Sequence, residues 1–151
     1  MSEKKILSKR LSRVAAVQIM YQINATSSVD IQKIINNFIE HYVKQNPDCQ
    51  GINYKFLESL VGRFSESLNL DEIINNNLEY DKSLSNAPII GVSIIKVAII
   101  EMIFEKTDIP VIINEYIEIA KSFVDYNFVH FINAILEKIS KRIERKCQAK
   151  A

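Results

Sequence analysis

Hydrophobic residues recur along most of this chain at intervals of three and four positions, the period of an amphipathic α-helix. The clearest stripe lies between residues 31 and 42 and follows Ser27, Ser28 and Asp30, which are residue types that start helices. Further stripes predict helices over residues 8–24, 57–68 (capped by Asn53), 73–78, 110–120 and 128–143. Residues 89–106 are apolar nearly all round, which predicts a central helix surrounded by others.

The breaks between these stripes are short and contain residues that end or begin helices. Pro47 and Gly51 mark a loop, Pro88 closes a break over residues 83–88, and Pro110 is well placed to open a helix. Strand alternation and hairpin dipeptides do not appear in the sequence. The pattern therefore predicts an all-α fold of about seven helices, and a length of 151 residues predicts a single domain over residues 1–151.

Charge is segregated along the sequence although the net charge is only +1. Residues 1–13 carry five basic side chains against Glu3, and residues 138–150 carry six against Glu144. The long middle part must therefore be acidic. Two basic ends on an acidic body suggest a localised site for an anion, such as a nucleic-acid backbone.

The basic N-terminal segment is the first candidate site. Lys5, Lys9 and Arg13 are spaced four residues apart and would lie within about 80° of one another on a helix, with Arg10 beside them. Positive charge near a helix N-terminus opposes the helix dipole, and RNA phosphates would compensate it. A disordered basic tail is the alternative. The basic C-terminus is more simply explained by favourable interaction with the dipole of the last helix.

A second candidate site lies at the start of the last helix. His130 and Asn133 are three residues apart and share a helix face, and Phe131 belongs to the core stripe or its edge. Aromatic, imidazole and amide groups near cations can stack on unpaired bases and form hydrogen bonds with them. An ordinary core role for Phe131 is the alternative.

The sequence contains no motif that indicates catalysis or metal binding. His41, Cys49, His130 and Cys147 lack the spacing of metal ligands, and phosphate-binding loops and nucleophile elbows are absent. We expect Glu118 and Lys121 to form a solvated pair rather than acid–base machinery, with Glu115 also facing outward. The sequence predicts no catalytic residue, no cofactor and no metal, and hence no enzyme.

Cellular location is predicted from cysteine use and hydropathy. The two cysteines lie far apart and form no disulfide framework, which fits a reducing compartment. The N-terminal residues lack the apolar stretch of a signal peptide, and the most apolar run is shorter than the roughly 20 residues of a membrane span. We expect a cytoplasmic protein without a membrane contact.

Four stretches of the sequence resemble the NusB family of transcription antitermination proteins. Residues 109–123 (IPVIINEYIEIAKSF) are similar to the family's Ile-Pro followed by Ile-Asn-Glu-Ala-x-Glu-Leu-Ala-Lys-x-Phe. Residues 131–137 (FINAILE) resemble its Phe-Val-Asn-Gly-Val-Leu-Asp, and residues 94–102 (IIKVAIIEM) resemble its Ile-Leu-Arg-x-Ala-x-x-Glu-Leu. Residues 9–22 (KRLSRVAAVQIMYQ) resemble the family's opening of arginines, an alanine-rich turn and Gln-x-x-Tyr.

The resemblance implies a seven-helix fold of two packed sub-bundles. It implies pairing with NusE, a protein of the small ribosomal subunit, and joint binding of boxA, a single-stranded RNA signal of ribosomal RNA operons. This binding would anchor an antitermination complex to RNA polymerase. The resemblance also implies that Lys9, Arg10 and Arg13 hold RNA phosphates and that Phe131 lies at the RNA face. Glu101 is the candidate contact for a protein partner, and a homodimer is possible.

This sequence departs from the family pattern mainly after residue 123. The family's Gly, Ser and Lys are Val124, Phe128 and His130 here, its later Gly is Ala134, and its central-helix Arg is Lys96. Phe128 could be a stacking platform or a larger hydrophobic staple. Two alternative functions are a pure protein–protein interaction module, and a domain like the one that precedes the catalytic domain of certain ribosomal-RNA cytosine methyltransferases. This chain would lack that catalytic half.

Overall fold

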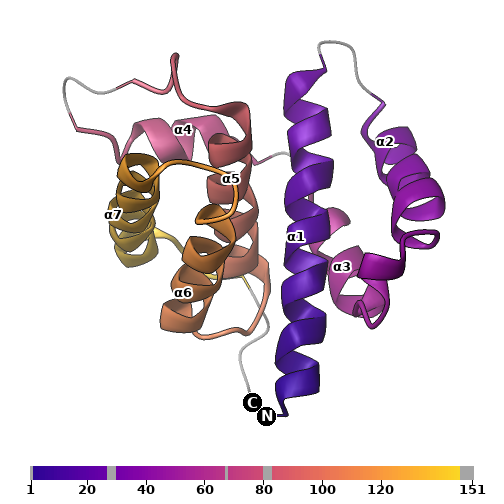
Figure 1. Ribbon diagram of the computed structural model, residues 1–151. Helices are drawn as coiled ribbons and strands as arrows, with labels where there is room; N and C mark the ends of the chain where they lie inside the picture. The colour runs from indigo at the N-terminus through magenta and orange to yellow at the C-terminus, as the bar shows by residue number, and fades with distance from the viewer. Residues whose placement is uncertain (1, 27–29, 67, 80–82, 147–151) are drawn as a thin grey trace. The chain divides into compact units, whose positions relative to one another are not determined.

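The computed structural model describes residues 2–26, 30–66, 68–79 and 83–146, so Cys147 lies outside the described residues. Over this part of the chain it contains seven α-helices and no strand, which confirms the all-α prediction. The contacts divide the chain into two compact units, residues 1–66 and residues 67–151 (Figure 1). The single domain over residues 1–151 remains a prediction.

The first unit is built on one long helix, α1 (Glu3–Ala25), which packs against both α2 (Ile31–Phe38) and α3 (Tyr54–Val61) (Figure 1). The stripe that predicted a helix over residues 31–42 continues past α2 as a π-helical turn, Ile39–Val43. Asp30 caps α2 by accepting a hydrogen bond from the Lys33 N–H. Ser27 and Ser28 lie outside the described residues.

Helix α1 begins five residues earlier than the predicted start at Ser8. Ser2 is its N-cap, and the Ser2 hydroxyl accepts a hydrogen bond from the Lys5 N–H at 3.2 Å. Serine followed by an acidic residue in the first turn is a favourable helix start, although no apolar stripe marks it. Lys5 therefore lies in the first turn of an ordered helix.

Helix α3 is shorter than the predicted stripe over residues 57–68, which was wrong beyond Val61. The predicted cap is confirmed, because the Asn53 side chain accepts a hydrogen bond from the Phe56 N–H at 2.9 Å. After Val61 the backbone bonds shorten to three-residue spacing, from the Arg63 N–H to Leu60 and from the next N–H to Val61. Beyond this point Phe64 lies in a turn and Leu68 in irregular backbone, so the apolar period there does not correspond to a helix.

The second unit is organised around α5 (Ile89–Phe104), which packs against α6 (Ile109–Ala120) and α7 (Tyr126–Arg142). The short α4 (Leu70–Asn75) packs against α7. Eleven of the 16 residues of α5 are buried, which confirms the central helix that the apolar run predicted. Within the described residues, no helix combines the length and apolarity needed to cross a membrane.

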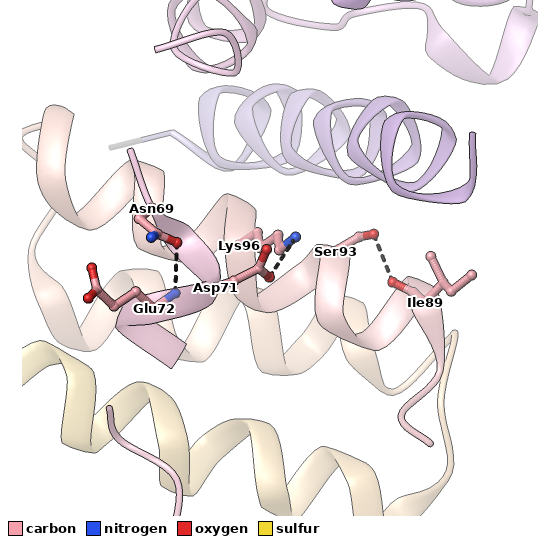
Figure 2. A network of polar contacts seen from close by, with 6 residues as sticks. All are labelled: Asn69, Asp71, Glu72, Ile89, Ser93 and Lys96. Carbon is pink, nitrogen blue, oxygen red and sulfur yellow. Dashed lines mark hydrogen bonds and ion pairs between the residues drawn. The ribbon is translucent and has the colours of Figure 1, made fainter. Parts of the chain in front are cut away.

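A polar contact joins α4 to α5 (Figure 2). The Lys96 ammonium lies 3.2 Å from the Asp71 carboxylate, and the Lys96 side chain is only 13% exposed. Asn69 caps α4 by accepting a hydrogen bond from the Glu72 N–H at 3.0 Å. Lys96 of the central helix therefore forms an ion pair with α4, in which the Asp71 carboxylate stays largely exposed to solvent.

Phe128 of α7 packs closely on α5 at Gly91. A Cβ atom built on Gly91 would lie 2.4 Å from Cε2 of the Phe128 ring, well inside van der Waals contact. Phe128 is half-buried and its ring lies 5.1 Å from that of Phe131. Phe128 is therefore a packing residue between α5 and α7, and this contact requires a glycine at position 91.

Two arginines of the basic C-terminal segment, Arg142 and Arg145, bind backbone and side-chain oxygens. The Arg145 guanidinium donates to the carbonyl oxygens of Glu105 and Thr107, at 2.5 Å and 2.8 Å, just beyond the end of α5. Arg142 donates to the side-chain oxygen of Asn77 at 3.2 Å. These two arginines therefore join the end of α7 and the residues just after it to the rest of the second unit, which agrees with a structural role for this part of the basic segment.

Candidate nucleic-acid interface

The four basic candidates on α1 differ strongly in exposure. Lys5 is exposed, Lys9 and Arg10 are half-buried, and Arg13 is only 3% exposed. The Lys9 Nζ atom and the Arg13 Cζ atom lie 5.0 Å and 5.1 Å from the centre of the same Phe56 ring. Arg13 is therefore a packed residue of the first unit, and the accessible charge of this segment lies at Lys5, Lys9 and Arg10.

Hydrogen bonds fix this part of α1 to the segment that leads into α3. The Ser8 hydroxyl donates to the Gly51 carbonyl at 2.5 Å. The Ser12 hydroxyl oxygen accepts from the Asn53 N–H at 3.0 Å and donates to the Asn53 carbonyl at 2.9 Å. Gly51 has a φ of 86°, a left-handed conformation that favours glycine. The basic face of α1 is thus held rigidly beside Phe56, rather than forming a disordered tail.

The three candidates on α7 do not form a single surface. Phe131 is half-buried beside Phe128 and lines a recess with the segment over residues 83–88. His130 and Asn133 are exposed and line a different hollow, which α7 forms with α6. Asp125 fixes the start of α7 by accepting a hydrogen bond from the Phe128 N–H at 2.8 Å. The structure therefore confirms the shared face of His130 and Asn133 and separates Phe131 from them.

Two acidic candidates are buried in the second unit. Glu101 is fully buried, and its carboxylate accepts a hydrogen bond from the Tyr116 hydroxyl at 2.7 Å. Glu115 is 6% exposed, so the prediction that it faces outward was wrong. Glu118 does form the expected pair with Lys121, at 2.8 Å on the surface. Glu101 therefore stabilises the packing of α5 on α6, and its side chain does not reach the surface.

The sequence reasoning missed two aromatic residues at these sites. Phe56 looks like an ordinary core position, and only the structure shows that two cations lie over its ring. Tyr126 is the first residue of α7 and is 75% exposed, with its ring 4.4 Å from that of His130. Its position directly after Asp125, a residue type that caps helices, was the available signal.

Within the described residues, no three His, Cys, Asp or Glu side chains gather as a metal site would require. Burial, and then the nearby Asp48 carboxylate, raise the pKa of the Cys49 thiol. This thiol is therefore protonated at neutral pH, and a protonated thiol is a poor nucleophile.

The sequence is similar to a known protein family and to named proteins over nearly its whole length. A model of the NusB family matches residues 10–141, which is most of the chain. The chain belongs to the NusB family. A transcription antitermination protein NusB of Rickettsia massiliae (strain Mtu5) is 33% identical over 154 aligned residues, covering 96% of this chain and 99% of that protein. The NusB protein of Rickettsia rickettsii (strain Sheila Smith) is 35% identical over 156 aligned residues, with the same coverage.

Membership of the NusB family agrees with the helical architecture and covers nearly all of the chain. The match includes Arg10 and Arg13 of the basic segment and begins after Lys5 and Lys9. It also spans His130, Phe131 and Asn133. The match to the family model therefore gives no information on Lys5 and Lys9, and any role of these lysines in RNA binding is argued from their positions on α1.

Proposed function

We propose that this chain is a transcription antitermination factor that binds boxA-like single-stranded RNA together with NusE. The complex would anchor antitermination components to RNA polymerase in the cytoplasm. Family membership over residues 10–141 carries the proposal, since the curated relatives are named transcription antitermination proteins. No catalytic step is part of this function.

The geometry of α1 supports the RNA-binding part. Lys5, Lys9 and Arg10 lie within two turns of one ordered helix, and Lys5 and Lys9 retain access to solvent. The backbone that carries these cations is already ordered in the helix before RNA binds. The protein therefore loses less conformational entropy when the cations contact phosphates. Phe131 and the exposed pair His130 and Asn133 on α7 would contact bases.

The proposal is tested by measuring RNA binding, with and without purified NusE, over a salt series. The RNAs are a boxA-like single strand and a scrambled control of the same composition. We expect the boxA-like strand to bind more tightly, the preference to grow with NusE, and affinity to fall as salt rises. Equal affinity for both strands in the presence of NusE would contradict the proposal and favour a protein–protein interaction module.

A charge variant tests the role of α1. Lys5→Ala/Lys9→Ala should flatten the slope of log K against log salt by about 1.4, at about 0.7 per phosphate contact on a single strand. The matched control is Lys33→Ala/Lys44→Ala, which removes the same charge from α2 and the turn after it, where Lys44 pairs only weakly with Glu40 on the surface. An equal change of slope in both variants would indicate a general charge effect and no site on α1.

A further inference from the structure

A hollow on the second unit lies between α6 and α7 and has a volume of about 630 Å³. Its apolar floor includes Ile113, Ile117 and Val129, and its polar rim includes Asn114, Lys121 and Asn133. Small-molecule sites commonly have volumes of about 300–1,000 Å³ and this same division between apolar lining and a few polar groups. The hollow therefore has the size and composition of a binding site.

Two aromatic rings stand at the α7 side of this hollow. The rings of Tyr126 and His130 lie 4.4 Å apart with an angle of 88° between their planes, an edge-to-face contact. Tyr126 is 75% exposed, an unusual exposure for a large aromatic side chain, and His130 is also exposed. The contact between them, one helical turn apart, restrains the tyrosine ring and so reduces the entropy that a stacking ligand would have to remove.

We infer that this hollow receives one unstacked nucleobase of a bound single-stranded RNA. An exposed aromatic ring offers a stacking face, and the Asn114 and Asn133 amides each supply both donors and acceptors for a base edge. An apolar helix would instead require a long apolar groove, whereas the rim here is polar. The inference rests on the proposed function, because it assumes that RNA passes over the start of α7.

His130 adds a second ring at the side of the hollow. It packs edge to face on Tyr126, and its exposed imidazole can both stack on a base and form hydrogen bonds with it. The α7 side of the hollow therefore offers groups suited to contact with a base.

The test combines a protein variant with an RNA variant. Tyr126→Ala should weaken binding of the boxA-like strand, with NusE present, by about tenfold, which corresponds to about 1.4 kcal/mol. Tyr126→Phe should bind as the unchanged protein does, because it keeps the ring. Neither substitution alters charge, so the dependence on salt should stay the same. Tyr42→Ala, which removes another exposed tyrosine from the first unit, is the matched control and should have little effect.

Strands with a single abasic nucleotide, one at each position, then locate the base. At the position whose base fills the hollow, the effects of Tyr126→Ala and of the abasic site should not add, because each removes the same contact. Additive effects at every position would overturn the inference. Binding of AMP or UMP that depends on Tyr126, without coupling at any RNA position, would assign the hollow to a free nucleotide and also overturn it.

This failure is distinguishable from failure of the proposed function. If the unchanged protein shows no preference for the boxA-like strand even with NusE, the proposed function fails before any variant is compared. If the unchanged protein has that preference and Tyr126→Ala binds equally well, only the assignment of the hollow fails. Circular dichroism should confirm that the variants at position 126 are folded, as expected for a residue 75% exposed.

Discussion

Among individual residues, Arg13 combines a positive charge with almost complete burial. Its guanidinium lies 5.1 Å from the centre of the Phe56 ring, and it is only 3% exposed. A charge placed over an aromatic face contributes about 0.5–2 kcal/mol, and the aliphatic part of a buried arginine adds packing contacts. Arg13 therefore contributes to the stability of the fold, whatever it contributes to RNA binding.

We predict that Arg13→Ala lowers the free energy of unfolding by about 1–3 kcal/mol, because it removes this contact and leaves unfilled space. Lys5→Ala, in the same helix but exposed, should change it by less than about 0.5 kcal/mol. Urea unfolding measures both. Equal stability of the two variants, together with a flatter salt dependence of RNA binding for Arg13→Ala, would instead make Arg13 a phosphate contact.

The seven predicted RNA contacts and the predicted partner contact Glu101 illustrate which features of single residues can be read from a sequence. The spacing of Lys9 and Arg13 placed them correctly on the helix predicted over residues 8–24, because the helical period fixes direction around the axis, whereas Lys5 lies on the same helix but outside the predicted bounds. The period does not reveal what faces a charged residue, so the burial of Arg13 and Glu101 was not foreseen. Whether a polar residue is buried depends on partners distant in the sequence, such as Phe56 or Tyr116.

Among the elements, the packing of α7 on α5 depends on one pair of residues. The Phe128 ring occupies the space in which any side chain at position 91 would begin. Replacing Gly91 by alanine therefore brings together two opposing effects. Alanine favours a helix by about 1 kcal/mol over glycine, whereas inserting a carbon atom into a filled space costs about 1–3 kcal/mol.

We predict that the sign of the Gly91→Ala effect depends on residue 128. In the unchanged chain the substitution should destabilise the fold, because the clash exceeds the gain in helix propensity. In a Phe128→Ala background it should stabilise the fold by up to about 1 kcal/mol, because the ring is gone. Thermal unfolding of the four proteins of this double-mutant cycle gives the answer. The same effect in both backgrounds would show that the ring does not fill this space.

The boundaries of the elements show where periodicity fails as a predictor. The long apolar run predicted α5 well, because a helix buried on all sides needs no stripe. The start of α1 depended on the Ser2 cap, and the end of α3 depended on local turns after Val61, neither of which alters the apolar period. The turn at Ile39–Val43 adopts π-helical bonding within a stripe that continues without a break.

For the molecule as a whole, the question raised by the two compact units is whether they unfold together. The sequence predicts one domain over residues 1–151, whereas contacts group the chain into residues 1–66 and 67–151. A unit of about 65 residues has a marginally sufficient core on its own. A single cooperative transition would make the two units one domain in the thermodynamic sense.

We predict that Leu57→Ala, in the core of the first unit, shifts the unfolding of the entire chain. Leu57 is fully buried, and its truncation should cost about 2–5 kcal/mol. Calorimetry should show one transition at a lower temperature, with equal calorimetric and van't Hoff enthalpies. Lys33→Ala, at an exposed position of α2 in the same unit, should leave the transition almost unchanged. Two separate transitions, of which only one moves, would contradict the single domain.

The contact between Gly91 and Phe128 also constrains how this sequence could have evolved. A chain with a small residue at position 128 would have room for a side chain at position 91, whereas the Phe128 ring in its present position leaves none. Glycine must therefore already have occupied position 91 when phenylalanine appeared, or an intermediate with a strained core would have had to survive. Relatives that carry an aromatic residue at position 128 should accordingly carry glycine at position 91. Relatives with a small residue at position 128 should carry various residues at position 91.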